Sequence, residues 1–234
     1  MPAKSTAAAQ LGAIAVFVKT PEYSPVKTRL AREVGQAAAQ QFYTLACAAT
    51  ASVLMQAQQA LEVQIYWAVT EPEALSHPSW SQFEVRDQGT GELGERMQFV
   101  FDALLKKHGY ALLLGADSPQ VCLDDLRQAD AILRSYSPQH LLAPATDGGF
   151  WCVGGNQAIP SQVWKETRYS CTNTLEDFEA LLRLHQLSAP VKLRRLTDVD
   201  TLADWLIARV ELQRLVSPTP AQLKLLSLNL ERGI

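Results

Sequence analysis

Three aspartates, Asp117, Asp198 and Asp200, are the residues of this sequence best suited to chemistry. Each stands in a loop that directly follows an apolar run typical of a buried strand. Hard cations such as Mg²⁺ and Mn²⁺ take oxygen ligands, and proteins usually hold them through one or two carboxylates and the phosphates of a substrate. The three aspartates therefore predict a Mg²⁺ or Mn²⁺ site. Asp117 before Ser118-Pro119, and Asp200 before Thr201, could instead serve to begin helices.

Three cations gather just after the first apolar run of the chain. Lys19, Lys27 and Arg29 all lie within residues 19–30. Phosphate groups are bound by fixed cations, and an arginine adds a bidentate fork. The segment therefore predicts a phosphate-binding loop, with a solvated basic loop as the equal alternative. Two prolines in the segment argue against a helix there.

Two glycine-containing segments could bring the backbone close to a ligand. Residues 88–97 contain Gly89 and Gly91, but their spacing differs from the dinucleotide-binding motif, and Glu92 and Glu95 disfavour a phosphate at the helix that follows. A turn that leads into a helix is the structural alternative.

The second segment is Asp147-Gly148-Gly149, which predicts a tight turn with positive φ. A plain hairpin turn is the equal alternative. In a functional interpretation Gly148 and Gly149 contact substrate, as does Ser118 beside Asp117, and Asp147 is the best candidate for a general base.

Apolar runs and helical patterns alternate along the chain, which is typical of a three-layer α/β/α fold with a mainly parallel sheet. Residues 110–115 are apolar and predict the central strand, with Leu112, Leu113 and Leu114 almost fully buried. The carboxyl edge of such a sheet is where ligands bind, so the aspartates and the cations would meet there. Thr174 and Asp177 predict a capping box at the start of a helix over 174–187. Further strands are expected at 11–18, 63–69, 83–86, 140–145, 150–153 and 191–196.

Composition places the chain among ordinary soluble globular proteins, with 47% hydrophobic and 19% charged residues. We expect a tail over 1–10, one domain over 11–216 and a Leu-rich extension over 217–234, which packs on the domain or makes a homodimer contact. The net charge of −3 gives no general attraction to nucleic acid. No apolar run approaches the roughly 20 residues of a membrane helix, and the N-terminus does not resemble a secretory signal. Four scattered cysteines indicate reduced thiols in a cytoplasmic protein.

The ordered motifs resemble those of a known family. They are Lys27-Thr-Arg-Leu30, residues 88–97, Leu114-Gly-Ala-Asp-Ser-Pro119, Pro144-Ala-Thr-Asp-Gly-Gly-Phe150 and Asp198-Val-Asp-Thr201. Over residues 11–208 the chain is similar to the bacterial GT-A-like glycosyltransferases related to the cofactor (phospholactate) guanylyltransferases, within the nucleotide-diphospho-sugar transferase superfamily. The resemblance implies a GT-A, Rossmann-like fold, a metal-binding role for Asp117, and a C-terminal acidic motif at Asp198-Val-Asp200. Glycosyltransferases of this fold usually carry Asp-x-Asp, where this chain has Asp117-Ser118-Pro119.

Taken together, these features predict a metal-dependent transferase that uses a nucleotide-activated donor, in the first place a glycosyltransferase with a nucleotide-diphospho-sugar. The metal, on Asp117 and an aspartate of the 198–200 pair, would neutralise the leaving diphosphate. Lys27 and Arg29 would add charge stabilisation. One alternative is a nucleotidyltransferase that joins an NTP to a phosphorylated acceptor, since it needs the same metal and cations. Another is a nucleotide-binding protein without turnover.

Overall fold

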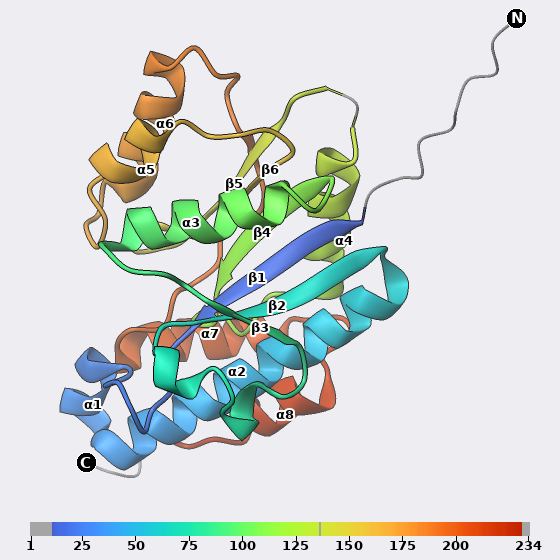
Figure 1. Ribbon diagram of the computed structural model, residues 1–234. Coiled ribbons are helices and arrows are strands. Elements are labelled where there is room, and N and C mark those ends of the chain that lie inside the picture. Colours follow the sequence, from blue (N-terminus) through green and yellow to red (C-terminus); the bar gives the residue numbers. More distant parts are fainter. Residues whose placement is uncertain (1–10, 136, 231–234) are drawn as a thin grey trace, which may run out of the picture.

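The computed structural model describes residues 11–135 and 137–230, which build a seven-stranded sheet with helices on both faces (Figure 1). The strand order is β3-β2-β1-β4-β6-β5-β7, so β4 is the central strand. The strands are β1 (Gly12–Val18), β2 (Val63–Val69), β3 (Glu84–Asp87), β4 (Tyr110–Gly115), β5 (His140–Pro144), β6 (Phe150–Gly155) and β7 (Val191–Lys192). Within the described ranges only β6 runs antiparallel to its neighbours. The predicted mainly parallel α/β/α fold is confirmed.

The chain changes direction across the sheet between β1 and β4. From β1 it proceeds outward to β2 and β3, and it then returns to place β4 on the other side of β1. The loops after β1 and β4 therefore diverge and leave a crevice at the carboxyl edge.

Helices cover the two faces in separate groups (Figure 1). One face carries α3 (Leu93–Leu105), α5 (Ser161–Glu166) and α6 (Thr174–Leu184). The other carries α2 (Gln36–Ala60) and α4 (Leu123–Leu133) against the sheet, with α1 (Thr28–Val34), α7 (Leu202–Gln213) and α8 (Pro220–Leu226) packed around α2. Two 3₁₀ turns, Pro72–Ala74 and Pro78–Trp80, follow β2.

Side chains of the central strands alternate between the two cores, as the pleat of a strand requires. Leu112 and Leu114 join the core under α2 and α4, whereas Leu113 joins the core under α3. The exposed fractions of Leu112, Leu113 and Leu114 are 0%, 3% and 2%. Their predicted burial is confirmed, and it fixes the strand that ends just before Asp117.

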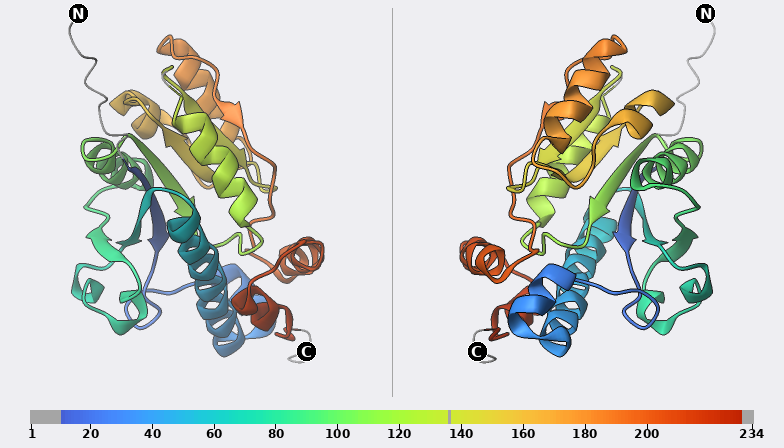
Figure 2. Two further views of the ribbon diagram at one scale, coloured as in Figure 1. Left: turned by 90° about the vertical axis from the view of Figure 1, so that its right-hand side faces the viewer. Right: turned by 90° about the vertical axis from the view of Figure 1, so that its left-hand side faces the viewer.

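Helix α8 is integrated into the molecule and lies beside α2 and α7 (Figure 2). Leu225 and Leu230 are buried together with Phe42 and Trp205 in a third apolar cluster. The buried amide of Gln222 donates hydrogen bonds to the carbonyls of Pro119 and Val121, both at 2.9 Å. The Leu-rich extension therefore supports the loop that carries Asp117.

Three local expectations were wrong in detail. Helix α1 begins at Thr28, because both prolines lie upstream of it and leave the backbone free to turn. Strand β7 is only two residues long, and its pairing resumes at a single bridge between Ala145 and Leu196. The capping box at α6 does not form, because the Thr174 hydroxyl donates to the carbonyls of Arg168 and Cys171.

Candidate functional site

A cleft of about 1090 Å³ opens at the carboxyl edge of the sheet, over the crevice between β1 and β4. It is bounded by the loop after β1, the starts of α1 and α3, the loop after β4, the 145–153 hairpin and the loop before α6. Its size suits a nucleotide-sized ligand, since small-molecule sites span roughly 300–1,000 Å³. Asp117, Asp147, Asp198 and Asp200 all line it, together with Lys19, Lys27 and Arg29.

Lys27 is the electrostatic centre of the cleft. Its side chain is 3% exposed, and Nζ lies 2.8 Å from Asp117 Oδ1 and 3.2 Å from Asp200 Oδ1. Burial by itself lowers the pKa of this ammonium, but Asp117, Asp198 and Asp200 outweigh that effect and hold the pKa above its usual value. A buried charge persists only when it is paired in this way. Lys27 is therefore a permanent cation in the floor of the cleft.

The backbone at Lys27 is in the left-handed region, with φ 47° and ψ 46°. This conformation costs a side-chain-bearing residue about 1–2 kcal/mol. Residues held there are over-determined by their surroundings, and the ion pairs to Asp117 and Asp200 supply that constraint. The residue thus turns the chain from the prolyl loop into α1 and directs its side chain to the carboxylates.

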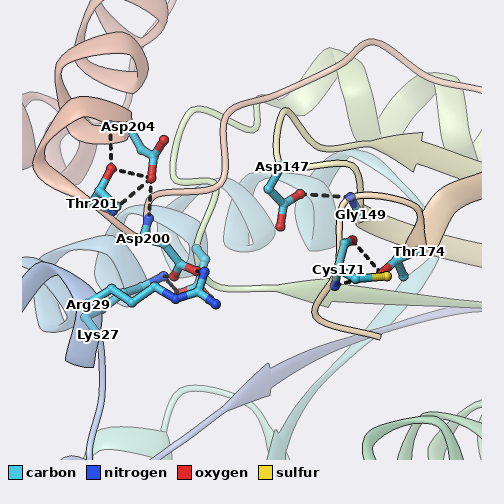
Figure 3. Close-up of polar contacts among 10 residues, drawn as sticks. Lys27, Arg29, Asp147, Gly149, Cys171, Thr174, Asp200, Thr201 and Asp204 are labelled. Carbon is cyan, nitrogen blue, oxygen red and sulfur yellow. Dashed lines mark hydrogen bonds and ion pairs between the residues drawn. The ribbon is translucent and has the colours of Figure 1, made fainter. Parts of the chain in front are cut away.

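Asp200 is neutralised by two cations. Besides Lys27 it contacts Arg29, whose Nη1 lies 3.1 Å from Asp200 Oδ2 (Figure 3). The helix cap is made by the neighbouring residue instead: Thr201 Oγ1 accepts from the Asp204 amide, and the Asp204 carboxylate accepts from the Thr201 amide. Asp200 is consequently free to organise the cations of the cleft.

Asp198 differs from Asp200, because no hydrogen bond or ion pair engages its carboxylate within the described ranges. Burial, and then the nearby Asp117 carboxylate, raise the pKa of Asp198 to about 8 against the opposing effect of Lys27, with smaller contributions from Asp200 and Asp147. The Val199 amide donates to the Asp117 carbonyl at 3.1 Å, which holds the two loops together. Asp117 and Asp198 are therefore neighbouring carboxyl groups, of which Asp117 is paired with Lys27 and Asp198 is held toward its neutral form by burial and by Asp117.

This pair is suited to a hard cation. Over residues 11–135 and 137–230, no three His, Cys, Asp or Glu side chains form a group that could hold a metal ion by themselves. Lys27 pairs with both Asp117 and Asp200, and Asp200 differs from Asp117 in that Arg29 pairs with it as a second cation. Two carboxylates completed by phosphate oxygens are nevertheless an ordinary environment for Mg²⁺. The donor set fits such an ion, and the predicted metal site stays a prediction.

The turn at Asp147-Gly148-Gly149 joins the loop before α6. Gly148 has φ 90°, and a Cβ there would lie 1.9 Å from the Thr172 carbonyl oxygen. The Gly148 carbonyl accepts from the Leu175 amide at 2.9 Å. The predicted positive φ is confirmed, but Gly148 contacts backbone, whereas Gly149 and Asp147 line the cleft. Asp147 Oδ1 accepts from the Gly149 amide at 2.9 Å, which orients the carboxylate (Figure 3).

Other predicted site residues lie at or beyond the edge of the cleft. Gly89 and Gly91 have positive φ and form the turn before α3, but neither lines the cleft, and Gly89 contacts the ring of Phe99. Ser118 is buried beside Asp117, and its hydroxyl has no partner among the described residues. Lys19 is exposed and lines the cleft, where it is accessible to a ligand.

Sequence reasoning missed residues that connect distant segments. The Tyr43 hydroxyl accepts from the Lys19 amide at 2.8 Å and donates to the Lys19 carbonyl at 3.0 Å. Gln88 donates to the carbonyls of Val18 and Ala68 and accepts from Arg96 at 3.1 Å. Of these residues only Arg96 could have been predicted from the sequence, because it is a cation within residues 88–97.

Comparisons with known proteins show the family to which this chain belongs and the structures that it resembles. The model of a family described as "Uncharacterized protein conserved in bacteria (DUF2064)" matches residues 48–171, more than half of the chain. The chain belongs to the DUF2064 family. No curated protein matches its sequence.

Solved structures resemble the DUF2064 chain at low sequence identity. A protein from Desulfovibrio desulfuricans G20, provisionally described as a nucleotide-diphospho-sugar transferase, is 23% identical with a TM-score of 0.78, and the match covers 92% of this chain and 93% of that one. The 4-diphosphocytidyl-2C-methyl-D-erythritol synthase from Anaerococcus prevotii DSM 20548 is 11% identical, with a TM-score of 0.52 over 88% and 97%. Rv0371C from Mycobacterium tuberculosis H37Rv, in complex with manganese, is 15% identical, with a TM-score of 0.50 over 86% and 98%. These likenesses establish the nucleotide-diphospho-sugar transferase fold.

Within the described residues, no helix has both the length and the apolar character needed to cross a membrane. The four cysteines, Cys47, Cys122, Cys152 and Cys171, are free.

Proposed function

We propose that this protein is a transferase that uses a nucleotide-diphospho-sugar as donor, with Mg²⁺ or Mn²⁺ as its metal. The observation that carries the proposal is the convergence of Lys27, Arg29, Asp117 and Asp198 at the crevice between β1 and β4. Cations and metal-binding carboxylates at one sheet edge are what a diphosphate requires.

Lys27 and Arg29 stabilise the diphosphate as it leaves. Charge that develops on a departing phosphate is best stabilised by groups that are already in place, because they need no reorganisation during the reaction. Asp200 holds both cations at 3.2 Å and 3.1 Å. Lys19 and Arg96 extend the cationic side of the cleft toward the rest of the donor.

Asp117 and Asp198 are the residues that would hold the metal. A bound divalent ion would neutralise charge on the diphosphate. Asp198 supports this assignment because its carboxylate has no protein partner within the described ranges and lines the cleft. Of the structural neighbours, the one from M. tuberculosis contains manganese, which is consistent with this proposal.

Ligand-dependent stability tests the donor site. A ligand that binds only the folded state stabilises it by about 2.7 kcal/mol at a hundredfold excess over Kd. We expect UDP- or GDP-sugars to raise the melting temperature strongly only with Mn²⁺ or Mg²⁺, and to do so more than GTP or CTP. Asp117→Asn should abolish the metal-dependent increment, whereas Lys27→Ala should weaken binding with or without metal.

The matched control is Asp124→Asn, since Asp124 is an exposed carboxylate on α4 paired with Arg127. It should behave like the parent. An NTP preference would favour the nucleotidyltransferase alternative. If no nucleotide shifts the melting point with either metal, the donor site is wrong.

A further inference from the structure

The charges of the cleft are divided between two sides. Four cations line it, Lys19, Lys27, Arg29 and Arg96, and all of them come from the loop after β1, α1 and α3. The opposite side is formed by the 145–153 hairpin and residues 169–174, which we call the far wall. Among the described residues, no lysine or arginine of the far wall lines the cleft. Figure 3 shows Lys27, Arg29 and Asp200 on one side and Asp147, Gly149, Cys171 and Thr174 on the other.

The far wall offers neutral polar groups and one carboxylate. Ser170, Cys171 and Thr172 are exposed and line the cleft beside Asp147. Asp147 Oδ1 is held by the Gly149 amide, whereas Oδ2 has no hydrogen-bond partner among the described residues. The adjacent Arg168 does not line the cleft, because its guanidinium is bound to Asp177 at 2.6 Å and 2.9 Å.

The far wall is also preformed. Gly148 and Thr172 are in backbone contact, and the Leu175 amide binds the Gly148 carbonyl. The Thr174 hydroxyl stabilises the loop by donating to the carbonyls of Arg168 and Cys171, at 2.8 Å and 2.9 Å. The hairpin and the loop therefore present their side chains as one surface that needs little ordering when a ligand binds.

This chemistry discriminates between classes of acceptor. A phosphorylated or carboxylated molecule needs cations or converging N–H groups at its anionic end. On the far wall it would instead meet the carboxylate of Asp147, which lines the cleft. Hydroxyl groups, in contrast, can donate to a carboxylate and exchange hydrogen bonds with serine and threonine.

We infer that the far wall binds an uncharged acceptor rich in hydroxyl groups, such as a sugar or another polyol, and that Asp147 accepts the proton of the attacking hydroxyl. The inference rests on the proposed function for the position of the donor. It deepens that function by selecting glycosyl transfer to a neutral hydroxyl over nucleotidyl transfer to a phosphorylated acceptor.

The step balances with the groups present. The acceptor oxygen forms a bond to the anomeric carbon of the donor sugar, and the bond from that carbon to the diphosphate oxygen breaks. Its electron pair leaves with the nucleoside diphosphate, which faces Lys27 and Arg29. The proton of the acceptor hydroxyl passes to Asp147, and the products are a glycoside and the nucleoside diphosphate.

Cys171 provides a direct readout of the far wall. Cys171 is exposed on this surface and its thiol donates to the Arg168 carbonyl, whereas Cys47 and Cys152 are buried. We would alkylate the full-length protein with N-ethylmaleimide and follow the Cys171 and Cys122 peptides by mass spectrometry. Reactions would contain glucose, mannose or glycerol, or in parallel glucose 6-phosphate or glycerol 3-phosphate, each with and without UDP and Mn²⁺.

The factor by which a neutral compound slows alkylation of Cys171 should be at least about tenfold larger than the factor for its phosphate. A tenfold difference in affinity corresponds to about 1.4 kcal/mol of binding free energy. Cys122, beside Arg194 and away from the cleft, should react at an unchanged rate. Thr172→Arg adds a cation to the far wall and should shift protection toward the phosphorylated compounds.

Protection by the phosphates alone, or by none of the compounds, would overturn the inference. The melting shift with UDP and Mn²⁺, measured on the same samples, tests the donor site separately. A shift without neutral protection leaves the proposed function standing and removes this inference. Protection by the neutral compounds without a melting shift would contradict the proposed donor site, and only the binding of a neutral acceptor at the far wall would remain supported.

Discussion

The three aspartates of the cleft differ in their ion-pair partners. Lys27 is held between Asp117 and Asp200, and Arg29 adds a second cation to Asp200. Asp198 has no such partner within the described ranges, although it lies near Asp117. In the proposed function, Asp198 and Asp117 would therefore hold the metal, whereas Asp200 would position the cations for the phosphate groups.

Substitution of the two neighbouring aspartates should separate these roles. Asp198→Asn should weaken Mn²⁺ binding, because it removes an anionic ligand, and UDP affinity measured without metal should change little. Asp200→Asn should leave Mn²⁺ affinity within about threefold, well under the tenfold that about 1.4 kcal/mol represents, but should weaken UDP, since Lys27 and Arg29 lose their common anchor. Electron paramagnetic resonance of Mn²⁺ and calorimetry with UDP measure the two quantities. Equal losses of Mn²⁺ affinity in both variants would contradict the division.

Substitution of Asp147 should lower the turnover rate and leave donor binding unchanged. Asp147→Asn keeps the shape and can still accept from the Gly149 amide, but it removes the proton acceptor. General-base catalysis contributes about 10²–10⁴-fold, so kcat should fall by that order with a sugar that protects Cys171. The Kd for UDP with Mn²⁺ should stay unchanged. A parent-like kcat would exclude Asp147 as the base.

At the scale of elements, α8 is a structural support for the site. Gln222 is 1% exposed and binds the carbonyls of Pro119 and Val121, which flank the turn after Asp117. Truncation of this amide leaves two buried acceptors without a donor, and each such group costs about 1–3 kcal/mol.

Gln222→Ala should therefore lower the free energy of unfolding by about 2–6 kcal/mol, since two acceptors lose their donor. It should also reduce the stabilisation by UDP and Mn²⁺, because the Asp117 loop loses its anchor. Lys224→Ala, an exposed change on the same helix, is the matched control. Chemical denaturation with and without ligand gives both quantities. A stability loss with full ligand response would mean that α8 supports the fold alone.

The elements themselves were largely predictable from sequence, because local composition determines them. Mainly apolar runs predicted β2 and β4, and β4 placed Asp117 at the carboxyl edge. The end of β7 was misjudged because Arg194 leaves the sheet to bind Asp125. A basic pair inside an apolar pattern carries no sign of such a partner.

The supports of the site were not predictable in the same way. Tyr43 reaches Lys19 across 24 residues, and Gln222 reaches Pro119 across 103 residues. Such contacts depend on how whole helices pack, and one glutamine in a helix resembles any other. The charges of the site could be read from the sequence, whereas the groups that hold them in place could not.

For the molecule as a whole, the cations of the cleft are grouped on one side although the net charge is negative. The chain carries −3 overall, yet four cations line one side of the cleft. In the proposed function a nucleoside diphosphate would meet this cationic side, whereas the net charge of the whole molecule would repel it weakly. Exposed charges separated by more than a Debye length, about 10 Å at 0.1 M salt, are screened, and buried pairs are screened much less.

Salt should consequently distinguish Lys27 from Arg29, the two cations that we propose contact the diphosphate. Arg29 is 64% exposed and Lys27 is 3% exposed. UDP affinity, measured by calorimetry without metal, should fall as KCl rises, because the Debye length shrinks to about 3 Å at 1 M. Arg29→Gln should flatten this dependence, whereas Lys27→Met should lower affinity at every salt concentration and leave the slope nearly parental. Binding of a neutral sugar should not respond to salt. If Lys27→Met removes the salt dependence instead, the buried ammonium acts through long-range attraction and not as a fixed contact to phosphate.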